Sequence, residues 1–400
     1  MNLKEFHSED FKNFVLDHLN EDPALLLLRH QGKTDFDLKV AVQQISARQK
    51  AKKKLPEWVS NQDIIFPASL SLEQSSSEVT ASYKAKNLSG HRFIDLTGGF
   101  GVDSYYLGRK FKSATYCERN IELAEIVRHN LETLAPSHFE VYKGDGIDFL
   151  YSSNEHYDLI YLDPARRGNA NQKLYKLSDC EPDVVNHWDL LKSKGSKVLI
   201  KASPMLDLSQ ALEEIPDIRK IKVISVKNEV KEVLLESASE TKAQVEISTV
   251  DLGEEERSFN FSLEQEQNSI SEFSNPEKYL FEPLAGILKV GGFKVFGSRF
   301  GLKKLGPNSH FYTANSHPED IPARVFEIIQ EIKPSKKELK RLFPEGKVNV
   351  ISRNFSMGAE AIKKKFRLKD GGEEYLIATK TLERYTVFHC HRHGTKKSEG

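Results

Sequence analysis

A glycine-rich turn directly after a short apolar run, within residues 92–108, constrains the fold of this chain more than any other feature. The run ends at Asp95, the glycines are Gly98, Gly99 and Gly101, and a helical pattern begins after them. This order predicts a strand, a tight turn and a helix. Because glycine has no side chain to collide with a ligand, backbone N–H groups of such a turn can approach one closely.

Three further segments extend this pattern along the chain. A second strand-like run ends at Glu118, the tripeptide Gly-Asp-Gly occupies residues 144–146, and the run YDLIYL leads into Asp163 and Pro164. Strand-like and helix-like segments alternate throughout this region, which predicts a parallel sheet with helices on both faces. Two β-like runs on either side of Lys227-Asn228 then predict an antiparallel hairpin that closes the sheet.

In this order, the four segments resemble the class I S-adenosylmethionine-dependent methyltransferases, over roughly residues 70–235. The resemblance implies a doubly wound, Rossmann-like α/β sheet and S-adenosylmethionine as the cofactor. In that family, matching residues form the floor beneath the methionine part of the cofactor, hold the ribose hydroxyls and lie beside the adenine. Here these are Asp95, Gly99 and Gly101 for the floor, Glu118 for the ribose and Asp145 for the adenine. Thr97 and Gly98 in the same turn are further candidate cofactor-binding residues.

The segment before the glycine turn, residues 67–86, is a second candidate for contact with the cofactor. Methyltransferases often fold such a segment over the cofactor, so Glu73 and Gln74 are candidate cofactor-binding residues. Capping of a helix by one of the serines at positions 75–77 explains the same residues equally well.

The resemblance also places Asp163 and Pro164 opposite the reacting atom, as the catalytic pair. There, a carboxylate and a nearby backbone carbonyl can accept hydrogen bonds from an exocyclic NH₂ group and direct its lone pair at the methyl group. The sequence departs from the amine-methylating pattern, because Ala165, Arg166 and Arg167 stand where an aromatic residue is usual. The acceptor atom stays open, and a base nitrogen is the leading interpretation.

Three basic residues near this pair are candidate substrate-binding residues. Arg166 and Arg167 suit a substrate phosphate, although a structural ion pair explains them equally well. Lys201, after the fifth strand-like run, suits either a pairing with Asp163 or a phosphate. In the same loop, Asp207 either shapes the pocket or belongs to a helix cap.

The chain divides by composition into four predicted regions. They are a helical region at 1–66, the methyltransferase domain at 67–240, a small ferredoxin-like connector at 241–330 and a basic domain at 331–400. A helix is predicted at residues 321–332. The small domains are predicted to be α+β.

The last predicted region carries 17 Lys and Arg against 9 Asp and Glu. Strand-like segments flank a basic helix at 358–365 there, and this pattern is similar to a THUMP-like RNA-binding domain. The resemblance implies structured RNA, a tRNA or rRNA, as the partner, with Lys363, Lys364 and Lys365 contacting phosphates.

Several classes of protein and site are not expected. In a strand, one face would carry His389, His391 and His393, and Cys390 would point to the other face. No metal site is therefore predicted. Three scattered cysteines and no long apolar run predict a cytoplasmic protein without disulfides or a membrane span. The sequence leaves the oligomeric state open.

Three alternative functions remain beside the leading one, an S-adenosylmethionine-dependent RNA methyltransferase. A nicotinamide-dependent oxidoreductase nearly fits the glycine motif, but Ser104 replaces its third glycine, and Asp95 suits a sulfonium better than a pyrophosphate. A non-catalytic RNA-binding adaptor would keep the same fold. A small-molecule methyltransferase would not need the basic domain.

Overall fold

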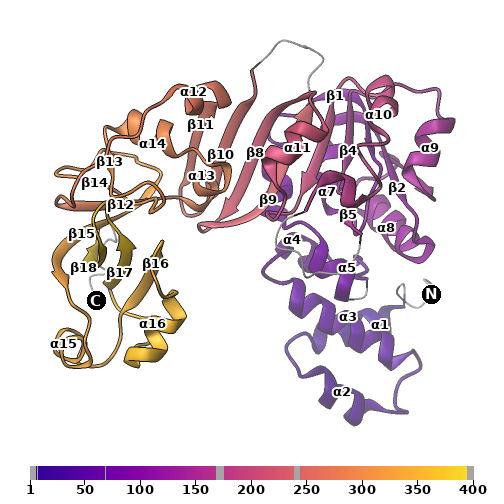
Figure 1. Ribbon diagram of the computed structural model, residues 1–400. Coiled ribbons are helices and arrows are strands. Elements are labelled where there is room, and N and C mark those ends of the chain that lie inside the picture. Colours follow the sequence, from indigo (N-terminus) through magenta and orange to yellow (C-terminus); the bar gives the residue numbers. More distant parts are fainter. Residues whose placement is uncertain (1–5, 7, 68, 168–174, 238–243, 394–400) are drawn as a thin grey trace. The chain divides into compact units, whose positions relative to one another are not determined.

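The computed structural model describes residues 6, 8–67, 69–167, 175–237 and 244–393 (Figure 1). The chain forms two compact units, one of residues 1–220 and 233–243 and the other of residues 221–232 and 244–400. Each unit is built around its own part of the β structure. The predicted boundary at 240/241 lies outside the described residues, and the predicted division into four regions stays a prediction.

The first unit begins with the predicted helices α1 (Glu9–Asp17), α2 (Pro23–His30), α3 (Leu38–Ala51) and α4 (Pro56–Ser60). Arg48 on α3 is buried, and its guanidinium donates to the backbone carbonyls of Val59, Asn61, Gln62 and Ile64. Burial lowers the pKa of Arg48 to about 10. The side chain therefore fixes the loop after α4 to α3.

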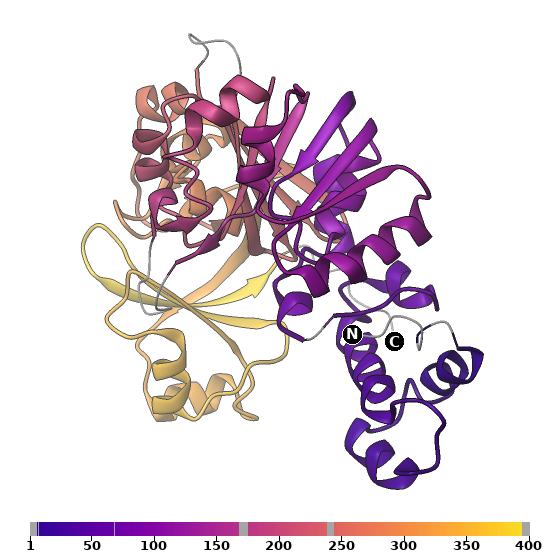
Figure 2. The same ribbon diagram turned by 90° about the vertical axis from the view of Figure 1, so that its right-hand side faces the viewer.

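The predicted α/β sheet is confirmed in this unit (Figure 2). Its strand order is β3-β2-β1-β4-β7-β9, and β9 alone runs antiparallel to its neighbour β7. The strands are β1 (Gly90–Asp95), β2 (Phe111–Glu118), β3 (Phe139–Lys143), β4 (Leu159–Leu162), β7 (Val198–Ala202) and β9 (Glu229–Ser237). The connecting helices are α7 (Val102–Gly108), α8 (Ile121–Leu134), α9 (Gly146–Ser152), α10 (Trp188–Lys194) and α11 (Leu208–Glu214).

The N-terminal helices share a hydrophobic core with one side of this sheet. Trp58 of α4 packs edge-on against Phe100 and Tyr105, and the same core includes Tyr116 of β2 and Val127 of α8. Between α4 and β1 come α5 (Ser69–Gln74) and α6 (Glu78–Ala85). Ser77 caps α6 by accepting from Thr80 N, so the predicted serine cap is confirmed.

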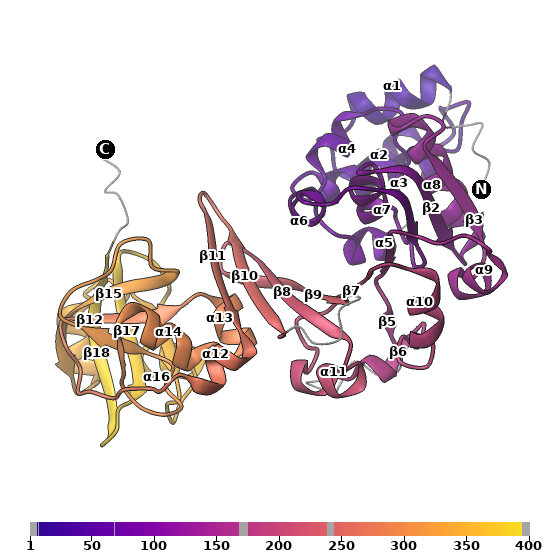
Figure 3. The same cartoon turned by 90° about the horizontal axis from the view of Figure 1, so that it is seen from above.

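The predicted hairpin consists of β8 (Ile218–Val226) and β9, which are neighbours in the sheet (Figure 3). The prediction that it closes the sheet is wrong, because β10 (Glu246–Leu252) and β11 (Glu256–Ser262) continue the strand order beyond β8. Lys227 and Asn228 between β8 and β9 have φ values of 51° and 62°. Two successive residues with positive φ match the right-handed twist of the flanking strands, as in a type I′ turn.

The second unit continues with β10 (Glu246–Leu252) and β11 (Glu256–Ser262), and then a seven-stranded sheet in the order β13-β14-β12-β15-β18-β17-β16. The strands of this sheet are β12 (Tyr279–Pro283), β13 (Lys303–Lys304), β14 (Tyr312–Ala314), β15 (Ala323–Ile332), β16 (Asn349–Arg353), β17 (Glu374–Lys380) and β18 (Tyr385–Arg392). Its helices are α12 (Leu263–Asn268), α13 (Ala285–Val290), α14 (Phe293–Phe300), α15 (Lys336–Leu342) and α16 (Ala359–Phe366).

The helix predicted at residues 321–332 is wrong, because this segment forms β15, paired with β12 and β18. The pairing with β18 shifts register between Ile328 and Gln330. An irregularity of this kind interrupts the alternation of faces, so the apolar residues of the strand fall at helix-like spacing. The predicted boundary at 330/331 falls inside this strand.

A buried carboxylate connects three strands of the second sheet. Glu282 of β12 is 2% exposed and accepts hydrogen bonds from Arg324 of β15, at 2.8 Å, and from Arg353 of β16, at 3.0 Å. Since burying a charge is favourable only when it is paired, both arginines stabilise this position.

Candidate active site

The predicted site residues lie where the strand order of the first sheet reverses. β1 and β4 are neighbours, although β2 and β3 lie between them in the chain. In open parallel sheets, such a reversal leaves a crevice outside the carboxyl ends of the two strands. Asp95 is the last residue of β1, and Asp163 directly follows β4.

Asp95 is a buried carboxylate held by local hydrogen bonds. It is 1% exposed and accepts from Thr97 N at 2.9 Å and from the Ser104 hydroxyl at 2.5 Å. Burial, together with the negative charges of Asp103 and Asp163, raises the pKa of Asp95 to about 7. A cation placed beside this group would favour its ionised form.

The glycine turn is packed too closely for side chains. A Cβ atom on Gly98 would lie 2.0 Å from the Tyr116 ring, and one on Gly101 would lie 2.6 Å from Val127. Gly99 and Gly101 also have φ values of 54° and 80°, which favour glycine. The turn is therefore a tight passage from β1 into α7, as the sequence predicts.

Glu118 and Asp145 lie beside this turn. One oxygen of Glu118 accepts from Gly99 N at 3.0 Å, and the other accepts from Asn120 N at 2.7 Å. Asp145 caps α9 by accepting from Ile147 N at 2.8 Å. A Cβ on the next residue, Gly146, would lie 2.3 Å from the carbonyl oxygen of Leu96, so the two loops are in close contact.

Both the backbone and the side chain of Asp163 are held by neighbouring residues. Its N–H donates to the Thr97 hydroxyl at 2.6 Å, which joins the ends of β1 and β4. One oxygen of its carboxylate lies 2.5 Å from Lys201 Nζ of β7. The Asp163 side chain is 36% exposed, so it is accessible from the crevice.

Other candidates lie in the same unit but have structural contacts. Arg166 lies over the Tyr175 ring, at 5.7 Å from its centroid, and Arg167 forms an ion pair with Glu181. The two strands β5 (Ala165–Arg166) and β6 (Cys180–Glu181) pair there. Asp207 caps α11, as its capping interpretation predicts.

Glu73 and Gln74 are exposed residues at the end of α5. The Glu73 carboxylate lies 3.8 Å from Lys50, and its carbonyl accepts from Lys54 at 2.7 Å.

The three predicted RNA-contacting lysines belong to the last turn of α16 in the second unit. Lys363 is paired with Asp370 at 2.6 Å and with Glu360 at 2.5 Å. Lys364 and Lys365 are exposed.

A cluster of buried polar residues beside Asp163 was not predicted. Asp103, in the first turn of α7, contacts Lys84 of α6 at 2.8 Å, and Lys201 at 3.3 Å. Ser76 and Tyr161 each donate a hydrogen bond to Asp103 at 2.7 Å. The sequence shows Asp103 only two residues after Gly101, without any sign of its partners.

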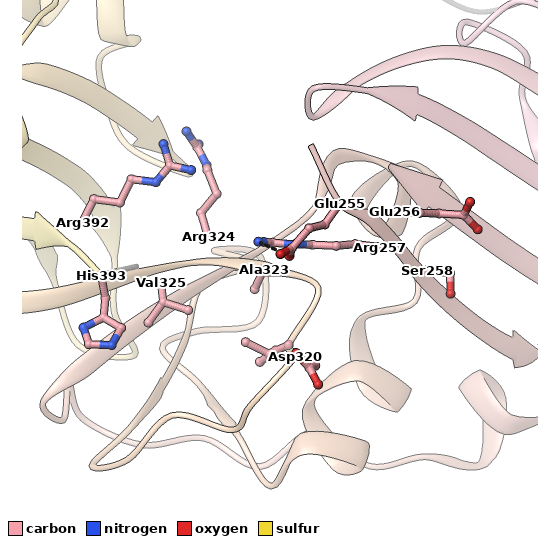
Figure 4. Close-up of a pocket in the computed structure, with 11 residues that line it drawn as sticks. Glu255, Glu256, Arg257, Ser258, Asp320, Ala323, Arg324, Val325, Arg392 and His393 are labelled. Atoms are coloured by element: carbon pink, nitrogen blue, oxygen red, sulfur yellow. Dashed lines mark ion pairs between the residues drawn. The ribbon is translucent and has the colours of Figure 1, made fainter. Parts of the chain in front are cut away.

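A hollow of about 440 Å³ lies in the second unit and contains none of the predicted site residues (Figure 4). Arg257, Arg324 and Arg392 line it. Arg257 lies 3.8 Å from Glu255, and Arg324 is bonded to Glu282. Three acidic residues, Glu255, Glu256 and Asp320, also line it, so its charges balance.

A solved structure decides the family of this chain. A proposed methyltransferase from Porphyromonas gingivalis W83 is 31% identical, with a TM-score of 0.87, over 98% of this chain and 99% of the other. The chain belongs to this methyltransferase family. An uncharacterized S-adenosylmethionine-dependent methyltransferase of Mycobacterium tuberculosis H37Rv is 21% identical to this chain. The match covers 80% of this chain and 87% of the relative.

Family models divide the methyltransferase into three matched parts. Residues 77–201 match conserved hypothetical protein 95, residues 279–322 match a ferredoxin-like domain, and residues 323–392 match a THUMP domain-like family. An uncharacterized RNA methyltransferase of Mycoplasma mobile is 33% identical over 106 residues, which is 26% of each chain. The enzyme is S-adenosylmethionine-dependent, and the ferredoxin-like and THUMP-like assignments are confirmed.

The residues present fit this cofactor. The ionised form of Asp95, present above about pH 7, suits a sulfonium and an ammonium group. Glu118 ends β2 and accepts from Gly99 of the turn, and its carboxylate can also accept from hydroxyl groups. The glycine turn brings backbone, and not side chains, to the crevice. A nicotinamide cofactor fits less well, because a buried carboxylate at the turn would repel its pyrophosphate.

Replacing Gly98 by alanine should destabilise the methyltransferase and lower its affinity for S-adenosylmethionine. The new methyl group would meet the buried Tyr116 ring, and overpacking of this kind costs about 2 kcal/mol. Thermal unfolding and calorimetric titration with the cofactor measure the two effects. Gly253→Ala is the matched control, since its Cβ would meet nothing closer than 3.8 Å. Equal melting temperatures for the two variants would contradict the packing argument.

The described residues contain neither a candidate metal centre nor a candidate membrane-spanning helix. No three His, Cys, Asp or Glu side chains there are arranged to hold a metal ion. His389 pairs with Glu374 at 2.7 Å, and Cys117, Cys180 and Cys390 are buried free thiols. Within the same ranges, no helix has the length and apolar character needed to cross a bilayer.

Proposed function

We propose that this methyltransferase transfers a methyl group to an amine nitrogen of a base in structured RNA, a tRNA or rRNA. The observation that carries the proposal is the placement of Asp163 at the carboxyl end of β4, with its side chain accessible and its backbone held by Thr97. A carboxylate accepts hydrogen bonds and donates none, so it selects an acceptor that carries N–H groups.

The residues of the chain need only bind, orient and exclude water in this reaction. S-adenosylmethionine supplies the methyl group on a positively charged sulfur. In the proposed arrangement, Asp95, Thr97, the glycine turn, Glu118 and Asp145 hold the cofactor. Asp163 and the adjacent backbone at Pro164 accept from the substrate amine, which directs its lone pair at the methyl carbon.

RNA as the substrate is supported by the second unit and by one relative. The match to the THUMP domain-like family covers residues 323–392, and part of the chain is similar to a protein named as an RNA methyltransferase. A base in folded RNA must leave its stack to reach the crevice, and the energy for this comes from contacts to the rest of the RNA. Phosphate contacts by the basic domain would supply it.

Tritium transfer from labelled S-adenosylmethionine into total cellular RNA, taken from a strain that lacks this gene, tests the proposal. We expect label in one RNA size class with the wild-type protein and none with Asp163→Ala. Label in protein or metabolite fractions alone would contradict an RNA substrate. Tight cofactor binding without transfer to any fraction would favour the adaptor function.

Reversing the charges of Lys364 and Lys365 together, with glutamate at both positions, should weaken RNA binding. If each lysine contacts one phosphate, the slope of log affinity against log salt should fall by about 1.5. Fluorescence anisotropy with the RNA class labelled by the enzyme measures the slope. Lys363→Gln is the comparison variant, because the Lys363 ammonium is already paired with Asp370 and Glu360. An unchanged slope in the double variant would remove α16 from the RNA interface.

A further inference from the structure

Beneath Asp163 lies a chain of alternating charges from three separate elements. Lys84 comes from α6, Asp103 from α7 and Lys201 from β7. Their side chains are 0%, 9% and 10% exposed. Charged groups are rarely buried this deeply without a structural or functional reason, because each loses its hydration.

Asp103 alone does not balance the two lysines. One of its oxygens lies 2.8 Å from Lys84 and the other lies 3.3 Å from Lys201. Burial opposes the ionised form of Asp103, but the charges of both lysines outweigh it and lower the pKa of this group. One carboxylate then faces two ammonium groups, and one positive charge remains.

Asp163 supplies the missing negative charge. Lys201 Nζ lies 2.5 Å from one Asp163 oxygen, which is closer than its distance to Asp103. Lys201 also donates to the Ser76 hydroxyl at 3.1 Å. Asp163, Asp103 and Ser76 provide three acceptors for the three N–H groups of the ammonium. The geometry of Lys201 therefore favours contacts within the protein over contact with a substrate phosphate.

The pairing also determines which part of Asp163 can meet a substrate. Lys201 occupies one carboxylate oxygen and Thr97 holds the Asp163 backbone N–H. Among the described residues, no hydrogen bond to the second carboxylate oxygen is present. With the backbone N–H and one carboxylate oxygen of Asp163 held in this way, the second oxygen is left as the acceptor for a substrate.

We propose that Lys201 is a positioning residue, and that the buried Lys84–Asp103–Lys201 chain holds the Asp163 carboxylate in one orientation toward the acceptor amine. Lys201 then acts on methyl transfer only through Asp163. This inference rests on the proposed role of Asp163. Of the two interpretations predicted for Lys201, it adopts the pairing with Asp163 in place of the phosphate contact.

A double-mutant cycle of Asp163→Asn and Lys201→Met tests the inference. Methionine keeps most of the length of lysine without its charge, and it leaves Lys84 and Asp103 as a balanced pair. We expect Lys201→Met to lower kcat for transfer to RNA by about thirtyfold and to change the apparent KM for RNA by less than about threefold. In the Asp163→Asn background, the same change should cost nothing further.

Lys197→Met is the matched control, because Lys197 precedes the same strand but is exposed and 3.9 Å from Glu236. It should transfer methyl groups at the wild-type rate. Melting temperature and cofactor affinity of each variant show whether it is folded. A crystal structure of Lys201→Met adds a measurement that needs no substrate, and we expect the Asp163 carboxylate to leave its present orientation.

The outcomes separate this inference from the proposed function. If Asp163→Asn transfers methyl groups at the wild-type rate, the proposed function of Asp163 is wrong. If Asp163→Asn is inactive but Lys201→Met raises KM and keeps kcat, Lys201 contacts the substrate and only the inference fails. A further loss of kcat in the double variant, or an unmoved Asp163 in the Lys201→Met crystal structure, would also overturn it.

Discussion

Replacing Asp163 by asparagine should lower the rate of methyl transfer by about a thousandfold, because the amine loses its charged acceptor in the transition state. Asparagine keeps the shape of the side chain, and the backbone N–H of residue 163 can still donate to the Thr97 hydroxyl. Affinity for S-adenosylmethionine should stay within about threefold, since the change removes an interaction made with the acceptor and not with the donor.

Single-turnover transfer of labelled methyl groups and calorimetric titration with the cofactor measure these two quantities. Asp189→Asn is the control, because Asp189 is fully exposed on α10 and pairs with Lys192 only at 3.7 Å. A rate for Asp163→Asn near that of the control would show that another group orients the acceptor. A large loss of cofactor affinity would instead place Asp163 in the cofactor site.

The affinity for S-adenosylmethionine should rise steeply as the pH increases toward about 7, because of Asp95. Burial raises the pKa of Asp95 from 3.8 to about 7, so the group is largely protonated below pH 7. A bound sulfonium favours the ionised form, and binding below this pH must therefore release a proton. The affinity should change by up to about tenfold per pH unit below pH 7 and level off above it.

Asp95→Asn should lower the affinity at pH 8 on the order of a hundredfold and remove its dependence on pH. Calorimetry in buffers of different ionisation enthalpy measures the released proton directly. S-adenosylhomocysteine is the matched ligand, because its sulfur is neutral and its affinity should depend less on pH. Equal pH dependence for the two ligands would show that Asp95 does not sense the sulfonium charge.

The raised pKa of Asp95 also predicts an effect on stability without the cofactor. Between pH 3.8 and about 7, the folded state keeps a proton on Asp95 that the unfolded state has lost. The contribution of this group to the free energy of unfolding should therefore fall as the pH rises through that window. Denaturant titrations at several pH values, compared with Asp95→Asn, isolate this contribution.

The sequence predicted the parts of the site whose signal is local. The glycine turn, the acids at strand ends and the Lys227-Asn228 hairpin depend on neighbouring residues, so their types and spacing are enough. The Lys84–Asp103–Lys201 chain depends on contacts between residues far apart in the sequence. Asp103 and Lys201 are 98 positions apart, and no local pattern marks such a pair. The sequence predicts a helix in place of strand β15, because the irregularity between Ile328 and Gln330 interrupts the alternation of its apolar residues. The predicted residues of the site are at the expected strand ends, while their assigned roles stay predictions.

The continuity of the seven-stranded sheet limits how its two parts can be exchanged between proteins. The ferredoxin-like match ends at residue 322 and the THUMP-like match begins at 323, yet β12 and β15 from either side pair over five residues. The Glu282 carboxylate then holds one arginine from each of two strands beyond that limit. A cut at this limit would expose two strand edges and leave the buried Glu282 carboxylate without its arginine partners. We therefore expect the two parts to unfold as one cooperative unit, and a chimera should carry both together.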